Sequence, residues 1–242
     1  MTDKLPPEAE AWIKSLDPKK RPFAQTGRLS ADSTERKTRS EEILTREGVP
    51  FLAHLPMIQP VSEIRFRSTA ESMDRLLGLT IAAIYAETAD GAWVRELAHD
   101  WQADGCFTPN ERAFLQQAEP SAQHRAQFSW RYEGVWVLLW TLGFQNTLGR
   151  PDHQANVAGM LKPMFELGPA AMRGKAHLRD GNEILNALDL VYRYHWACTE
   201  ARVKGRIMPA GLDGGVVMEW HYALNWITSY GDAAWDDVQT DT

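Results

Sequence analysis

One long amphipathic helix constrains the fold of this chain more than any other stretch. The segment Leu178–Gly205 holds about 25 helical residues, which at 1.5 Å per residue span roughly 37 Å. Asp180 followed by Glu183 is typical of a helix start, and Gly205 is typical of a helix end. Apolar residues recur along it at helical spacing: Ile184, Leu185, Leu188, Val191, Tyr192, His195 and Cys198. We therefore expect this helix to pack against several others.

A second, polar stripe runs along the same helix. It consists of Asp189, Arg193, Trp196 and Glu200, again at helical spacing. Alternating charges at this spacing favour ion pairs within the helix. The stripe is too ordered for a plain solvated surface, which indicates that the helix is covered on more than one side.

The rest of the chain also predicts helices. Apolar periodicity and capping residues favour helices over residues 33–48, 69–89, 93–101, 109–119, 121–143 and 216–230. Prolines predict an extended segment over 49–61 and short helical turns over 145–176. Residues 135–142 are apolar nearly all round, which is typical of a buried helix. No sustained alternation of period two occurs, so we predict an all-α fold. Residues 36–242 would form one multi-helix globular domain with a buried central helix, after a partly flexible extension over residues 1–35.

The composition excludes several classes of function for this chain. The chain has 242 residues and a net charge of −6, which argues against a nucleic-acid-binding protein and favours solubility or a basic partner. Asp17–Ser40 is locally basic, with seven Lys or Arg against three acids; it is either a solvated linker or an arm for phosphates or an acidic partner. The longest apolar run is about half of a membrane span. Two isolated cysteines and an N-terminus unlike a signal peptide predict a soluble, cytoplasmic protein.

The C-terminal residues differ from a typical disordered tail. Trp235 and Val238 are apolar anchors three residues apart, and four Asp lie between positions 232 and 241. Acids in a docked tail need partners, and guanidinium groups suit them. We therefore predict a docked acidic tail whose candidate partners are Arg131, Arg179, Arg193 and Arg202.

Several of these segments together resemble a known bacterial family. They are Phe128–Glu133 (FSWRYE), Glu183–Trp196 (EILNALDLVYRYHW), Gly215–Glu219 (GVVME), His221–Trp226 (HYALNW) and the closing Trp235–Thr242 (WDDVQTDT). In this order they are similar to domain-of-unknown-function family 4272, over residues from about Arg36 to Thr242. The resemblance implies a single domain without an assigned activity or cofactor. Trp220 stands where the resemblance leads us to expect a basic residue.

One set of residues permits a catalytic interpretation. His195 and His221, with Asp236 and Asp237, could form an acid–base pair or a mixed metal site, as the centre of a metal-dependent hydrolase. Asp236, Asp237 and Asp241 could instead hold Mg²⁺. The alternative is that the histidines are hydrogen-bonded core residues and that the acids anchor the tail. No H-E-x-x-H, Walker loop, G-x-S-x-G or G-x-G-x-x-G pattern is present.

The absence of a catalytic signature favours a non-catalytic module that binds a protein or small-molecule partner, as in an adaptor or immunity-like role. We predict no cofactor and no nucleic-acid or membrane partner, and the sequence leaves the oligomeric state and the partner open. The candidate binding residues are polar or aromatic side chains of the helical half: Arg131, Glu133, Arg179, Asp189, Arg193, Trp196, Asn225 and Trp235.

Deleting residues 235–242 should lower the free energy of unfolding by several kcal/mol, because a buried Trp235 and its neighbours would be lost. Thermal or urea denaturation of the shortened chain measures the loss. An unchanged melting temperature would show that the tail is free and that its acids serve something outside the domain.

Overall fold

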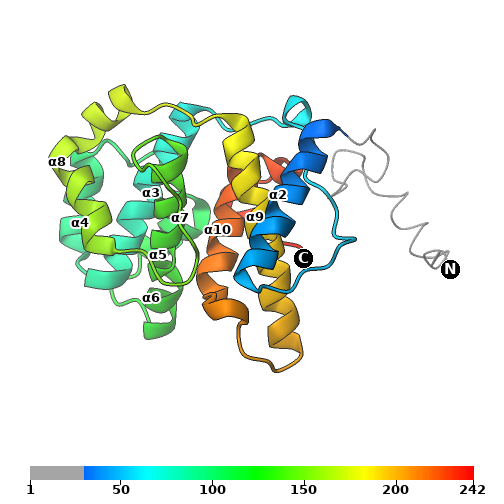
Figure 1. Ribbon diagram of the computed structural model, residues 1–242. Helices are drawn as coiled ribbons and strands as arrows, with labels where there is room; N and C mark the ends of the chain where they lie inside the picture. The colour runs from blue at the N-terminus through cyan, green and yellow to red at the C-terminus, as the bar shows by residue number, and fades with distance from the viewer. Residues whose placement is uncertain (1–29) are drawn as a thin grey trace, which may run out of the picture.

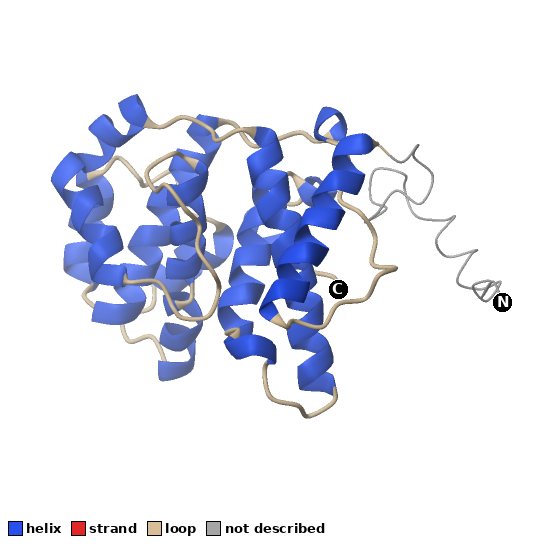
Figure 2. Cartoon of the chain, in the orientation of Figure 1, coloured by secondary structure: helices blue, strands red, loops and turns tan. Residues whose placement is uncertain are grey.

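The computed structural model describes residues 30–242, and every regular element in that range is a helix (Figures 1 and 2). The predicted all-α fold is confirmed. The α-helices are α2 (Ala31–Glu47), α3 (Thr69–Thr88), α4 (Gly91–Asp100), α5 (Pro109–Leu115), α6 (Ala122–Ser129), α7 (Arg131–Thr141), α8 (Val157–Lys175), α9 (Gly181–Val203) and α10 (Gly214–Ile227). Four 3₁₀ turns are η2 (Val61–Glu63), η3 (Pro209–Gly211), η4 (Tyr230–Asp232) and η5 (Trp235–Asp237).

The first part of the expected N-terminal extension, residues 1–29, lies outside the described residues, and so does most of the basic stretch. Helix α2 begins at Ala31 and therefore crosses the boundary expected at residue 36. Within residues 30–242, none of the helices combines the length and the apolar character needed to cross a membrane.

Capping side chains set most helix starts where the sequence predicts them. Ser68 and Glu71 form a reciprocal capping box at the start of α3, and Thr108 and Glu111 form another at α5. Asp213 caps α10 by accepting hydrogen bonds from two backbone N–H groups. Each cap satisfies N–H groups that have no partner inside the helix, so these starts are fixed by local sequence.

The long helix is present as α9, with 23 residues. Asp180 caps it by accepting from the Asn182 N–H, but Glu183 does not complete a capping box. Glu183 instead accepts a hydrogen bond from Arg179 Nη1 at 2.9 Å. Helix α9 packs on α10 along one side and on α2 along another, as its two stripes predict.

The helices pack in a series that places α7 at the centre. Helix α7 contacts α3 on one side and α10 on the other, and the series continues through α9 to α2 (Figure 1). A large core joins α3, α7, α9 and α10, while a smaller one lies between α2, α9 and α10. The members of the smaller core are Leu44, Val49, Tyr194, Ala197, Cys198, Leu212 and Val217. The predicted buried central helix is α7, and most of α3 is equally buried.

The prediction of one continuous helix over residues 121–143 is wrong. The helix is interrupted at Trp130, which separates α6 from α7. The Glu133 N–H bonds to the Trp130 carbonyl three residues back, which tightens the turn. The break turns the Trp130 ring against Gly215 at the start of α10, where an added Cβ would meet the ring at 2.6 Å. A contact between helices distant in sequence therefore fixes this break.

The prediction of only short turns over residues 145–176 is also wrong. Helix α8 covers Val157–Lys175 and is interrupted at Gly168, whose φ of 71° is accessible to glycine at little cost. Pro169 follows directly and starts the second segment, as proline favours a first helical position. Pro163 lies inside the first segment without interrupting it, so the prolines do not prevent a helix here.

The end of the chain is held by side chains of α10 and by a backbone N–H group of α5. Trp235 is buried, and the Tyr222 hydroxyl donates to its carbonyl oxygen. Asn225 donates to the Gln239 carbonyl at 2.8 Å, and Asp236 accepts from the Asn110 N–H at 3.0 Å. An added Cβ on Gly134 would meet the Trp235 ring at 3.3 Å, so this glycine makes room for the indole.

The expected pairing of the tail acids with four arginines is wrong for the described residues. Arg193 binds Asp189, Arg179 binds Glu183 and two backbone carbonyls, and Arg131 lies near Glu219. Arg202 is exposed and forms no ion pair within residues 30–242. Each of the first three arginines has a nearer acid in its own neighbourhood, while Asp232 pairs with Arg65.

The most deeply buried charges of α9 belong to the polar stripe. Arg193 donates to both carboxylate oxygens of Asp189, at 2.9 and 3.0 Å, and both side chains are fully buried. Arg193 also reaches the Pro56 carbonyl at 3.4 Å and lies 3.9 Å from Glu41 of α2. The expected intrahelical ion pair is therefore confirmed at Asp189–Arg193, whereas Glu200 pairs with Lys204 instead.

Substituting Asp189→Ala should lower the free energy of unfolding by about 3–5 kcal/mol, because it leaves the Arg193 guanidinium buried without its carboxylate. Urea denaturation measures the loss. Glu200→Ala is the matched control on the same helix and should cost at most about 1 kcal/mol, since its ion pair is partly exposed. Equal effects of the two substitutions would contradict a dominant role for the buried pair.

Candidate functional site

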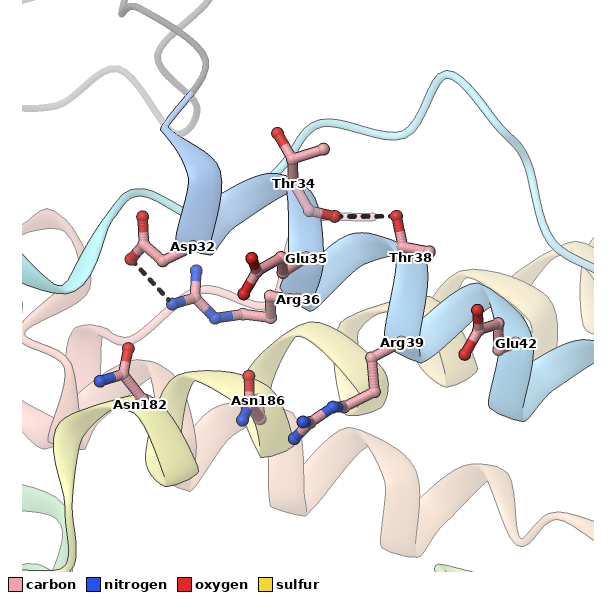
Figure 3. A pocket seen from close by; sticks show the side chains of 9 residues that line it. All are labelled: Asp32, Thr34, Glu35, Arg36, Thr38, Arg39, Glu42, Asn182 and Asn186. Atoms are coloured by element: carbon pink, nitrogen blue, oxygen red, sulfur yellow. Dashed lines mark hydrogen bonds and ion pairs between the residues drawn. The ribbon is translucent and has the colours of Figure 1, made fainter.

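A polar groove of about 550 Å³ lies between α2 and the start of α9 (Figure 3). The groove is open to solvent, and most of its lining comes from α2. Its lining residues are Asp32, Thr34, Glu35, Arg36, Thr38, Arg39, Glu42, Asn182 and Asn186. Three carboxylates, two guanidinium groups and two carboxamides thus face a single hollow.

The sequence of α2 explains why the groove is polar. The buried face of this helix consists of Ser33, Arg36, Ser40 and Leu44, of which only Leu44 is apolar. Leu44 belongs to the smaller core, so the C-terminal end of α2 is held by apolar packing. The N-terminal half is held mainly by hydrogen bonds, and this half lines the groove.

Asp32 and Arg36 build the fixed end of the groove. Asp32 accepts from the Val61 N–H at 3.0 Å and from Arg36 at 3.2 Å, and Arg36 donates to the Gln59 carbonyl. The hydrogen bond with Ser30, followed by that with Val61, lowers the pKa of Asp32 to about 2. The Nε–H of the buried Arg36 has no acceptor within residues 30–242.

The remaining charged groups of the groove are exposed and form no ion pair within residues 30–242. Arg39 lies one helical turn from Glu35 and nearly one turn from Glu42, spacings at which ion pairs form readily. Among the described residues it pairs with neither of them. Its side chain extends from α2 toward Asn186 on α9 (Figure 3). The carboxamides of Asn182 and Asn186 likewise form no hydrogen bond within residues 30–242.

The structure brings His195 and His221 together, as the catalytic interpretation requires. Their Nδ1 atoms are 2.9 Å apart, so one imidazole donates to the other. Burial, followed by the nearby Arg202 charge, lowers the pKa of His195 to about 4. Burial, followed by the charge of His195, lowers the pKa of His221 to about 3. Both rings are therefore neutral at pH 7 and lie inside the protein.

The acids of the tail do not join this histidine pair in a metal-binding group. Asp236 accepts from the Asn110 N–H, and Asp237 and Asp241 are exposed. Across residues 30–242, no three side chains of His, Cys, Asp or Glu form a group that could hold a metal ion. The metal-dependent alternative thus finds no shared ligand set in this part of the chain.

Glu133 and Trp220 form an internal contact rather than an open site. Glu133 accepts from the Ala155 N–H at 2.8 Å and from the Trp220 indole N–H at 3.0 Å. Burial raises the pKa of Glu133 despite these bonds. At position 220, where we expect a basic residue, the indole N–H is a hydrogen-bond donor to this carboxylate. Arg131 lies nearby, 3.6 Å from Glu219, whose pKa burial raises to about 7.

The other candidate binding residues also serve the fold. Arg179 donates to the backbone carbonyls of Trp140 and Gln145, which ties α9 to the end of α7. Asn225 holds the Gln239 carbonyl, Trp235 is buried, and Trp196 is half-buried against both cores. None of the eight predicted binding residues lines the groove.

The sequence analysis missed the groove, although two signals for it were present. Arg36 and Arg39 belong to the basic stretch that ends at Ser40, and Asn182 and Asn186 stand four residues apart at the start of α9. Polar residues at that spacing are common on solvated helix faces. Only the packing of α2 beside α9 turns them into one site.

Below pH 7 the protein should lose stability as the buried histidine pair is protonated. Both pKa values lie below that of a free histidine, so their contribution is complete above about pH 6.5 and falls as the pH drops toward 4. The loss is up to about 1.4 kcal/mol per pH unit for each histidine. Urea denaturation at pH 7 and pH 5 measures it. His221→Asn should reduce the slope and exposed His54→Gln should not; equal slopes in all three proteins would contradict the assignment.

Comparison with known proteins identifies one family that matches this chain. Neither the curated proteins nor the solved structures contain a match to this chain. The family described as Domain of unknown function (DUF4272) matches residues 36–238, which confirms the resemblance expected from the sequence. Because this match covers most of the chain, the protein belongs to the DUF4272 family.

Proposed function

We propose that this protein is a non-catalytic binding module that takes its ligand in the groove between α2 and α9. The observation that carries the proposal is the set of unpaired polar groups in one hollow: Arg39, Glu35 and Glu42 from α2, and Asn182 and Asn186 from α9. The groove is as large as ordinary ligand sites, which measure roughly 300–1,000 Å³.

The lining favours binding over chemistry. It contains no His, Cys, Lys or Ser, and its two hydroxyl groups are engaged in their own helix. The Thr34 hydroxyl donates to the Ser30 carbonyl at 3.1 Å, and the Thr38 hydroxyl donates to the Thr34 carbonyl at 3.0 Å. Within residues 30–242 neither hydroxyl forms a hydrogen bond with a carboxylate or imidazole that could activate it as a nucleophile.

The ligand that fits is polar and carries both hydrogen-bond donors and acceptors. Arg39 offers only donors, Glu35 and Glu42 offer only acceptors, and each asparagine offers both. A protein that presents a short polar segment meets this requirement, in keeping with an adaptor or immunity-like role. Free Cys106 and Cys198 support a reducing, cytoplasmic setting.

Nuclear magnetic resonance tests the proposal directly. Protein labelled with ¹⁵N is titrated with separate mixtures of tripeptides, amino acids, nucleotides and sugars at about 1 mM each, near the weakest affinity worth detecting. We expect one mixture to shift the carboxamide signals of Asn182 and Asn186 and the Nε–H signal of Arg39. Mass spectrometry should recover the ligand unchanged, since no reaction is proposed.

The carboxamide of Asn146 is the internal control, because it is exposed and lies outside the groove. Its signals should stay in place while those of the groove move. If no mixture shifts the groove signals, or if the recovered ligand is chemically altered, the proposed function is wrong.

A further inference from the structure

Resting on the proposed function, we infer that the ligand of the groove is an extended peptide segment that carries a carboxylate side chain. Asn182 and Asn186 bind the peptide main chain, and Arg39 binds the carboxylate.

The distance between the two asparagines along the helix axis is close to the repeat distance of an extended peptide. They lie four residues apart on α9, so their positions differ by about 6 Å along the helix axis. In an extended peptide every second residue presents its N–H and C=O to the same side, at intervals of roughly 6.6 Å. Each carboxamide has one acceptor and one donor group. Asn182 and Asn186 can therefore each pair with one residue of the ligand, two positions apart.

Arg39 supplies the contact for a side chain. It is exposed, it forms no ion pair within residues 30–242, and it extends across the groove toward Asn186 (Figure 3). A guanidinium group binds a carboxylate through two parallel hydrogen bonds, so an Asp or Glu of the ligand fits this position. Glu35 and Glu42 stand on either side of Arg39 along α2 and favour basic residues two positions before and after that acid, on the same face of the extended peptide.

Two other ligand types fit the groove less well. A helical peptide bonds its main-chain groups internally and would leave both carboxamides without partners. A phosphate group usually engages several cations, whereas Arg39 is the one exposed guanidinium of the lining and two exposed carboxylates flank it. An extended peptide of mixed charge matches the carboxamides of α9 on one side of the groove and the charged side chains of α2 on the other.

The probe is a fluorescein-labelled heptapeptide, Thr-Lys-Val-Asp-Val-Lys-Thr, acetylated and amidated at its ends and followed by fluorescence anisotropy. We expect Asn182→Ala and Asn186→Ala each to weaken binding about tenfold, the value of one to two hydrogen bonds. Arg39→Gln should weaken it about tenfold as well, but only while the central residue is acidic. With central Asp replaced by Asn, the Arg39 substitution should have little further effect.

Matched controls use exposed residues outside the groove. Asn146→Ala and Arg46→Gln should leave the affinity unchanged. All five substituted residues are exposed or partly exposed. Unchanged melting temperatures verify that each variant folds.

N-methylation of single peptide bonds tests the main-chain contact. Methylating the N–H groups one by one should weaken binding at alternate positions, because only every second residue faces α9. A uniform loss along the peptide, or none, would overturn the inference. So would the absence of heptapeptide binding at about 1 mM while a nucleotide, sugar or amino acid still shifts the groove signals, a result that leaves the proposed function standing. If nothing shifts those signals, the proposed function fails as well.

Discussion

The arrangement of α2, α9 and the extended segment before α3 depends on one buried ion pair. Arg193 is bound by both oxygens of Asp189 one turn earlier on α9, and it also contacts the Pro56 carbonyl and approaches Glu41. A guanidinium this deep in the protein is tolerable only with such partners, because an unpaired buried charge is very costly. Arg193 thereby links α9 to the extended segment and lies close to α2, which Leu44 and the hydrogen bonds of Arg36 also hold in place. The groove exists because α2 is held in that place.

Polar contacts hold other parts of the fold in the same way. Glu133 joins α7 to α10 through the Trp220 indole and to the loop before α8 through the Ala155 N–H. Arg75 of α3 pairs with the buried Glu111 of α5 and also lies over the Trp235 ring. These side chains are buried and contact one another, so they are not accessible to a ligand, although Arg75 Nε, Glu111 Oε1 and Trp235 Nε1 have no hydrogen-bond partner within residues 30–242. Most of the polar residues that stand out in the sequence thus stabilise the fold.

The polar side chains of the groove differ from those of the interior. There Glu35, Arg39, Glu42, Asn182 and Asn186 lie close together, and their side chains form no hydrogen bond or ion pair among residues 30–242. Arg39 is the clearest case. Glu35 and Glu42 lie on the same helix at spacings that favour ion pairs, yet neither of them pairs with it. A ligand with complementary charges could bind without displacing an existing contact. The groove is the candidate site because its polar groups without a partner in this range are open to solvent, whereas the polar groups of the interior are buried.

The sequence by itself determined the helical fold, the family and most helix starts, because periodicity and caps such as Ser68–Glu71 act over a few residues. It also determined the Asp189–Arg193 pair, whose members lie one turn apart on one helix. Only the tertiary structure decided the break at Trp130, the pairing of His195 with His221, the partners of the tail acids and the groove. Each of these depends on how helices distant in sequence pack together. Local patterns carry no information about which faces of such helices will meet.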